Sequence, residues 1–180
     1  MNRIILTALC FACCSTMMAQ QAKIGFFSMQ DLLNTDATYQ ETIANVTVLK
    51  QQYANEQRIA EEDFKEKYEL FLEQQATLAP SIREKRQSDL QTLLERTEKF
   101  RKESQQLIKQ SEEAALATAK SRINDAIRYI TANGDYLIIV NTDSDACPYI
   151  NPTYSEEVTE RLSSVLANPA LLPQTTDIAH

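Results

Sequence analysis

The chain contains only two glycines, Gly25 and Gly134, and the 108 residues between them include a single proline, Pro80. Glycine and proline are the residues that most strongly interrupt secondary structure. A long charged segment with one break near its middle therefore predicts two long helices folded back on each other. We expect an α+β fold in which residues 37–132 form a helical hairpin arm and residues 20–36 and 133–167 form a small β-rich body.

Apolar residues recur at helical spacing on both sides of the break, and charged or amide side chains fill most other positions, as on coiled coils. In an antiparallel hairpin, residues equidistant from the tip lie at the same level. Phe71 and Leu90 satisfy this condition, whereas Phe64 and Thr97 do not form an apolar pair. The predicted seam of the arm consists of Tyr53, Tyr68, Phe71, Leu90, Leu93 and Ile108.

The helix ends carry recognisable signals. Thr35 or Asp36 can cap the first long helix, because short polar side chains accept hydrogen bonds from the free amides of a first turn. Pro80 is expected to end that helix, and Ser81 with Glu84 fits a capping box for the next one. Gly134 is expected to end the second helix in a left-handed conformation.

The body should contain strands at residues 23–27 and 136–140, a short returning strand at residues 148–150, and a last helix capped by Ser155. Residues 137–140 are apolar on both faces, which indicates burial on both. So small a sheet is only marginally stable alone, and its strands are expected to share a core with other copies of the chain. The predicted oligomer contacts are Ile24, Phe26, Leu137, Ile139 and Ile150. Residues 168–180 are expected to form a flexible tail.

Residues 1–19 have the pattern of a secretory signal peptide: Arg3 gives a positive start, an apolar stretch follows, and Ala19 is a small residue at the cut. A lipoprotein signal ending at Cys13 is the alternative. Without residues 1–19 the chain has 17 basic and 25 acidic residues. This acidic balance argues against nucleic acid as a partner. No other stretch is long and apolar enough to span a bilayer, so we expect an exported, soluble protein whose one remaining cysteine, Cys147, is a buried thiol.

Catalytic chemistry finds little support in the sequence. The only histidine is His180 at the C-terminus, and no nucleophile–histidine–carboxylate set can be assembled around it. Residues 141–145 resemble the start of a calcium loop, but Ala146 stands where that loop requires glycine and Pro152 where it requires glutamate. We interpret this segment as a turn, and expect a protein that is not an enzyme and has no cofactor or metal.

The order of the segments resembles that of the Skp/OmpH-type periplasmic chaperones. The residues that carry the resemblance, within residues 23–166, are the opening segment 23–30, the strand 134–140, the segment 149–152 and the start of the last helix at 155–158. The resemblance implies a homotrimer whose helical arms enclose a cavity, in which unfolded outer-membrane proteins are held without ATP in the periplasm. This chain is acidic, whereas the best-known members are basic, so no lipopolysaccharide site is carried over. The cluster of Arg83, Lys85 and Arg86 near the tip is read as a solvated helix face.

Residues 70–72 form an apolar run that is wider than a two-helix seam requires. Part of the run should therefore face outward, where exposed apolar side chains mark interaction sites. We predict client contacts at Leu70, Leu72 and Leu78. The alternative function is a structural coiled-coil adaptor of the cell envelope, although such hairpins are flanked by larger β domains than this chain provides.

Overall fold

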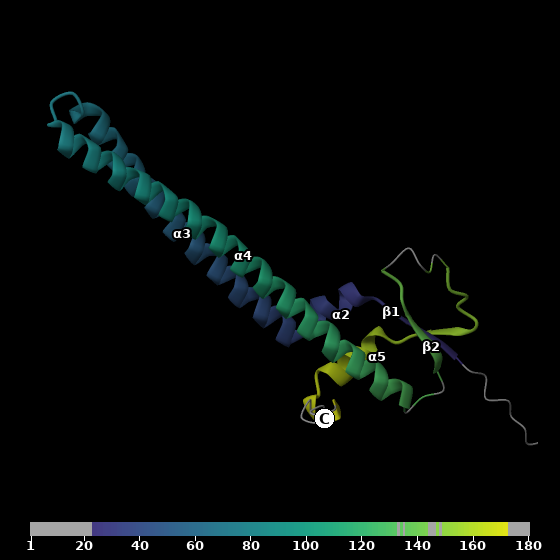
Figure 1. Ribbon diagram of the computed structural model, residues 1–180. Coiled ribbons are helices and arrows are strands. Elements are labelled where there is room, and N and C mark those ends of the chain that lie inside the picture. The colour runs from purple at the N-terminus through teal and green to yellow at the C-terminus, as the bar shows by residue number, and fades with distance from the viewer. Residues whose placement is uncertain (1–22, 133, 135, 144–146, 148, 173–180) are drawn as a thin grey trace, which may run out of the picture. The chain divides into compact units, whose positions relative to one another are not determined.

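The structure is a computed structural model that describes residues 23–132, 134, 136–143, 147 and 149–172. Two long helices and a small parallel sheet confirm the α+β fold (Figure 1). The chain divides into two compact units, with residues 33–122 forming one and the remaining residues the other. The predicted signal peptide and residues 173–180 of the predicted tail lie outside the described residues. Residues 169–171 of that tail form a short 3-10 helix, η2 (Pro169–Leu171).

The helical unit is an antiparallel hairpin of α3 (Ala37–Gln74) and the greater part of α4 (Pro80–Ala132) (Figure 1). At 1.5 Å per residue, the 38 residues of α3 reach about 57 Å. The turn between the helices is closed by local hydrogen bonds, Gln75 N to Phe71 O at 2.8 Å and Thr77 N to Gln74 O at 2.9 Å. The hairpin inferred from the spacing of glycine and proline is therefore present.

The capping box predicted at Ser81 and Glu84 is wrong, because α4 begins one residue earlier, at Pro80. Proline suits the first turn of a helix, where its missing N–H group needs no partner. Ala79 O instead accepts the amides of Ile82 and Arg83, each at 3.0 Å. Pro80 thus starts the second helix instead of ending the first.

The seam of the hairpin is narrow and partly polar. Its buried side chains come from both helices, namely Val46, Phe71, Thr97, Ser104, Ala115 and Ala119. The hydroxyl of Thr97 donates to Leu93 O at 3.0 Å, and that of Ser104 donates to Arg101 O at 3.0 Å. Because each hydroxyl bonds within its own helix, neither leaves an unpaired polar group in the seam.

The residues predicted for the seam lie at different depths. Phe71 is 6% exposed, while Leu90, Leu93 and Ile108 are half-buried. Tyr53 is half-buried and packs edge-on against Phe100, with ring centroids 5.9 Å apart. Tyr68 does not lie in the seam, since it is 44% exposed. Phe64 lies seven residues before Phe71 and so shares its inward-facing position in the heptad repeat. Tyr68 lies between the two, on the flank of the helix.

The base of the hairpin is held by a buried ion pair. Of the two candidate caps, Asp36 is the one that caps α3, and its carboxylate accepts a hydrogen bond from Thr38 N at 3.1 Å. Both carboxylate oxygens of Asp36 also accept bonds from Arg122 Nη1 on α4, at 2.9 and 2.7 Å. The Asp36 side chain is 3% exposed. One carboxylate thus both begins α3 and fastens it to α4.

The second unit contains a three-stranded parallel sheet in the order β2–β1–β3 (Figure 1). β1 (Lys23–Phe27) lies between β2 (Tyr136–Asn141) and β3 (Ser155–Glu157). The core of this unit consists of the buried residues Phe27, Leu32, Ile123, Ala126, Ile130, Val158, Leu162, Val165 and Leu166. Apart from Val158, which lies at the cap position of α5 (Thr159–Leu166), these residues come from β1, α2 (Met29–Thr35), the end of α4 and α5. Helices therefore supply most of the core around one short sheet.

The returning strand predicted at residues 148–150 is wrong for the part that the structure describes, because residues 149 and 150 belong to no strand. Asn151 organises a turn instead, accepting the amide of Thr153 on its side chain at 2.9 Å and the hydroxyl of Ser155 on its carbonyl at 2.7 Å. Ser155 consequently starts β3 and does not cap the last helix. The residue at the cap position of α5 is Val158, which makes no side-chain capping bond.

Gly134 follows α4 as predicted, but for a different reason. No glycine among the described residues has a positive φ angle. A Cβ atom at residue 134 would lie 2.9 Å from Ile130 O and 2.9 Å from Tyr136 Cε2. Glycine is therefore required by the close approach of Tyr136 to the end of α4.

The described part of the segment interpreted as a turn, residues 141–143, stabilises the start of α2. Asn141 Oδ1 accepts the amide of Met29 at 3.3 Å, and Asp143 Oδ2 accepts the amide of Gln30 at 2.6 Å. These amides open α2 and have no partner inside that helix. The polar side chains that resemble a calcium loop thus cap a helix.

Cys147 is half-buried and its Sγ lies 3.8 Å from Tyr149 O, so the predicted full burial of this thiol is wrong.

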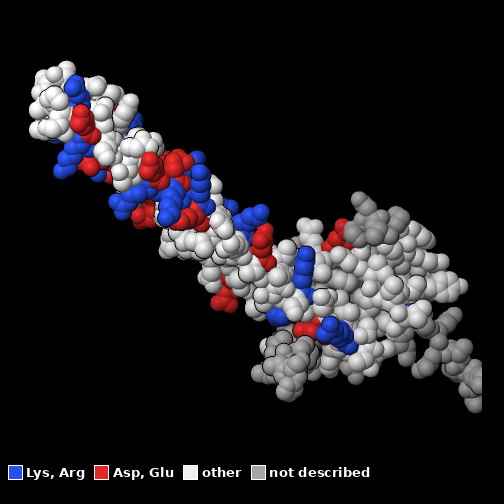
Figure 2. All heavy atoms as spheres, in the orientation of Figure 1, with Lys and Arg blue, Asp and Glu red and all other residues white. Residues whose placement is uncertain are grey.

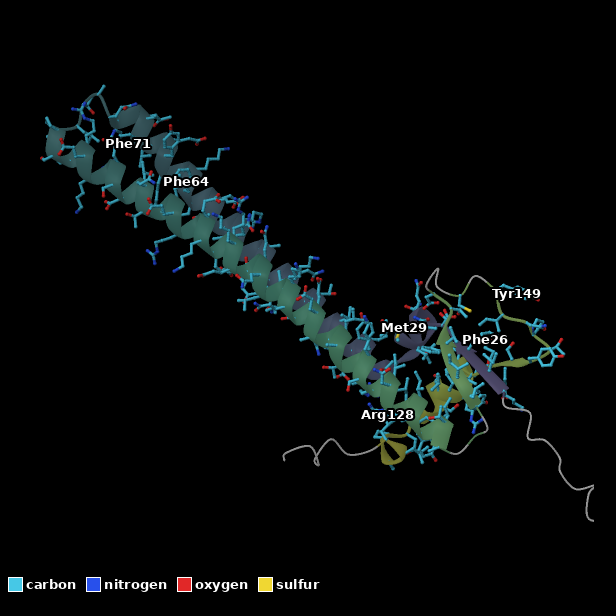
Figure 3. The ribbon with its side chains drawn as sticks, turned by 45° about the vertical axis from the view of Figure 1, so that its right-hand side comes forward. Phe26, Met29, Phe64, Phe71, Arg128 and Tyr149 are labelled. Carbon is cyan, nitrogen blue, oxygen red and sulfur yellow. The ribbon has the colours of Figure 1, made fainter. Side chains whose placement is uncertain are left out.

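One face of the sheet remains open. Ile24 pairs in register with Ile138, and Phe26 with Val140, so these four side chains share a face. Ile138 is 51% exposed and the neighbouring Leu137 is 76% exposed. Ile24, Phe26, Ile139 and Ile150 are half-buried (Phe26 is labelled in Figure 3). The predicted burial of β2 on both faces is therefore not achieved within one chain.

We expect Asp36→Ala to lower the free energy of unfolding by about 3 kcal/mol, because it removes a helix cap and leaves the Arg122 guanidinium without its carboxylate. Asp36→Asn should cost less, since the amide oxygen can still accept from Thr38 N. Lys50→Ala is the control: its pair with Glu112 is exposed, so the loss should stay below about 1 kcal/mol. Urea unfolding followed by circular dichroism measures all three, and equal losses for Asp36→Ala and Lys50→Ala would contradict the assignment.

The depth of the seam predicts a second contrast, between adjacent residues of α3. Phe71→Ala removes a buried ring and should cost about 3 kcal/mol, whereas Leu72→Ala, at a 46% exposed position, should cost about 0.5 kcal/mol. The same unfolding measurement compares the two variants. A loss at Leu72 as large as that at Phe71 would show that the seam runs elsewhere.

Candidate functional site

The outer half of the hairpin exposes apolar side chains beside its seam. Leu70 and Leu72 are 44% and 46% exposed, on either side of the buried Phe71. Successive residues of a helix point about 100° apart, so a single partner helix cannot cover all three. The geometry therefore leaves one leucine on each flank of the hairpin.

Each of these leucines lines a groove between α3 and α4, and the two grooves share Phe71 and Leu90. The first, which we call the charged groove, has a volume of about 530 Å³. Its walls include Leu70 and Leu93 together with the side chains of Lys67, Arg86, Asp89 and Arg96. Arg86 Nη1 bonds to Gln74 Oε1 at 2.9 Å and Lys67 Nζ pairs with Asp63 at 2.7 Å, whereas Arg96 has no ion pair among the described residues.

The second, which we call the uncharged groove, has a volume of about 370 Å³. Beyond the two shared residues, it is lined by Phe64, Tyr68, Leu72, Gln75, Gln87, Gln91 and Leu94. Phe64 and Phe71, both labelled in Figure 3, lie two turns apart on α3. The two sides of one hairpin thus differ in chemistry although they share their apolar floor.

Leu78, the third predicted client residue, is half-buried in the turn between the helices and lines neither groove. Nothing in the contacts of the structure tests client binding at any of these leucines, which stays a prediction. Leu70 and Leu72 are exposed enough to contact a partner, whereas the half-buried Leu78 is less accessible.

The rest of the hairpin surface is mostly polar, although single apolar side chains such as Val48, Ile59 and Leu107 are also exposed. Charged side chains of both signs cover its middle in the view of Figure 2. Exposed pairs four residues apart, such as Arg58 with Glu62 at 2.7 Å, hold these charges together on one helix. Surface pairs of this kind add little stability, but they keep a thin hairpin hydrated. The grooves differ from this surface because each brings several apolar side chains together.

Sequence reasoning missed two buried positions, Thr97 and Ser104, because it looked only for apolar pairs. The signal was present, since residues 90, 97 and 104 are spaced by seven and a seam follows that repeat whatever its residues are. The grooves were not visible in the sequence either. Their walls combine side chains from two helices, and only the register of the hairpin brings those side chains together.

Within the described ranges, no group of three or more His, Cys, Asp or Glu side chains lies close enough together to hold a metal ion. None of the helices in that part of the chain is long and apolar enough to cross a membrane. The site therefore offers a partner two grooves that share an apolar floor, one with charged side chains in its walls and one with amide side chains in its walls.

Comparison with known proteins places these features in a family. The model of the family described as outer membrane protein (OmpH-like) matches residues 23–162. A crystal structure of a candidate outer-membrane chaperone (OmpH-like) from Caulobacter crescentus CB15 is similar in fold, with a TM-score of 0.71 at 14% sequence identity over 85% of this chain and 88% of that one. No curated protein matches the sequence. The family model covers most of the chain, and the protein belongs to the OmpH-like outer membrane protein family.

Proposed function

We propose that this protein is an ATP-independent holdase chaperone of the periplasm, which binds unfolded outer-membrane proteins and keeps them soluble for assembly. Membership of the OmpH-like family supports a chaperone role, and the related Caulobacter protein is itself described as a candidate outer-membrane chaperone. The sequence pattern of residues 1–19 supports export.

The observation that carries the proposal is that Leu70 and Leu72, 44% and 46% exposed, each line a groove between the two helices of the hairpin. Exposed apolar side chains beside a groove cost solubility, and they are retained where a partner uses them. An unfolded chain presents many apolar segments and no fixed shape. Adaptable grooves on a slender arm suit such a client better than a single rigid pocket would, because many weak contacts can form and break independently.

Self-association is the second part of the proposal: three copies join through their sheets, as the family resemblance implies. The open face that carries Ile24, Phe26 and Ile138 supports this, as does the 76% exposure of Leu137. Burying such apolar surface between copies would stabilise a sheet that is too small to be stable alone. A trimer would also set three arms around one client.

The first test is light scattering of the mature protein, alone and after an outer-membrane barrel protein is diluted into it from urea. We expect a trimer alone, and a soluble complex of one trimer with one client. An oligomer that leaves the client to aggregate would contradict the holdase function. A stable complex with one fixed envelope partner instead would favour the structural adaptor.

The client contacts are tested by combining Leu70→Glu with Leu72→Glu. Both positions are exposed, so the fold should persist, while the new charges should weaken client binding at least about tenfold. The matched control combines Val48→Glu with Ile59→Glu, which are 53% and 46% exposed on the same helix and line neither groove. Suppression of client aggregation measures the effect, and equal loss in both double variants would refute a site at residues 70 and 72.

Self-association predicts a different response for Leu137→Glu. In one chain this side chain is 76% exposed, so the substitution should leave the secondary structure unchanged. If copies bury it, the charge should lower the mass measured by light scattering from trimer to monomer. An unchanged mass would exclude residue 137 from the contact between copies. Val48→Glu serves as the control.

A further inference from the structure

We propose that the uncharged groove binds an extended, uncharged peptide segment rich in aromatic and aliphatic side chains. The inference rests on the proposed holdase function and specifies which chemical class of client segment this side of the arm takes. It is carried by three properties of the groove: an exposed aromatic wall, a rim of amide side chains, and the absence of charge from its lining.

The wall of the groove is formed by aromatic and aliphatic side chains. Phe64 and Tyr68 stack nearly parallel, with ring centroids 5.8 Å apart and 11° between the planes. Tyr68 is 44% exposed, and Leu72 and Leu94 are 46% and 39% exposed. Phe64 is half-buried at an inward position and supports the ring of Tyr68, which lies on the flank of the helix, so the exposed part of the Tyr68 ring remains available to a ligand. A volume of about 370 Å³ can accept a few apolar side chains but not a folded domain.

The rim supplies neutral hydrogen-bonding groups. The side chain of Gln87 makes no hydrogen bond with any described residue, so its amide group is free to bind a ligand. Gln75 makes only a long bond, from Nε2 to Leu72 O at 3.4 Å, and Gln91 donates from Nε2 to Glu95 Oε1 at 2.7 Å. The side-chain oxygens of all three glutamines stay available as acceptors. An amide side chain donates and accepts at once, which matches the unpaired N–H and C=O groups of an extended peptide backbone.

Charge decides which ligand is the better fit. Charged residues make up 24% of the chain, yet none lines the uncharged groove. An anionic lipid head group or an acidic peptide would find cations in the charged groove, at Lys67, Arg86 and Arg96, and no counter-ion in the uncharged one. A buried, unpaired charge is costly, so the uncharged groove should reject both. A neutral apolar peptide meets no such penalty.

The test uses the full mature chain and a fluorescent, end-blocked peptide that alternates Tyr, Leu or Val with Ser or Thr. Gln87→Glu combined with Leu94→Glu places two charges in the uncharged groove and should weaken peptide binding, measured by fluorescence anisotropy, at least about tenfold. Val48→Glu combined with Ile59→Glu adds two charges at exposed positions of the arm that line neither groove. This double variant is the matched control and should leave affinity within about twofold. Equal weakening by both changes would overturn the proposal.

Two further measurements make the outcome decisive. A peptide with Glu in place of Ser and Thr, and vesicles containing phosphatidylglycerol, should each compete poorly for the uncharged groove; competition as strong as that of the neutral peptide would overturn the assignment. Circular dichroism checks that the double variant folds. Tyr68→Ala is a second, milder variant, and should weaken peptide binding in the same direction because it removes half of the aromatic stack.

The same proteins are assayed for suppression of barrel-protein aggregation. If the unsubstituted protein prevents aggregation but does not bind the peptide, the groove assignment is wrong and the holdase function stands. If it binds the neutral peptide through the uncharged groove but does not prevent aggregation, the groove assignment is supported and the holdase function is wrong.

Discussion

A two-helix hairpin has only one seam, and most features of this arm follow from that constraint. Each helix can bury one narrow stripe, so the remaining surface must be hydrated or must meet a partner. Over most of the arm the sequence meets this demand with charged side chains in pairs three or four residues apart. At residues 70–72 it does not, because three adjacent apolar side chains cannot all face one partner helix. The grooves on either side of Phe71 are a direct consequence.

The same constraint explains why the hairpin is fastened at its base. A seam that contains Thr97, Ser104, Ala115 and Ala119 buries little apolar surface, and so contributes little stabilisation along its length. The buried pair of Asp36 and Arg122 adds a directional contact where α3 begins. A buried pair specifies register more than it adds stability, because a shifted hairpin would leave a charge unpaired. Register in turn decides which residues meet in the grooves.

The body shows the opposite imbalance, with too much apolar surface for its size. Helices cover one side of the sheet and provide a compact core around Leu32, Ile123 and Leu162, all of them fully buried. The other side carries apolar side chains that one chain does not cover. Under the proposed function, the exposed apolar residues of the sheet meet other copies of the chain, and those of the arm meet the client. Fixed, repeated strand surfaces suit a second copy of the chain, and shallow grooves suit an irregular client.

The sequence by itself determined the hairpin, because a long segment without glycine, with apolar residues at helical spacing and one central proline, predicts two long helices. The same spacing identifies Phe71 as inward-facing. Only the tertiary structure decided that Ser155 belongs to a strand, that Asn141 and Asp143 cap a helix, and that Gly134 is needed for close packing. Each of these depends on a neighbour distant in sequence or on a competing local turn. The grooves belong to the same class, because their walls exist only once the two helices are in register.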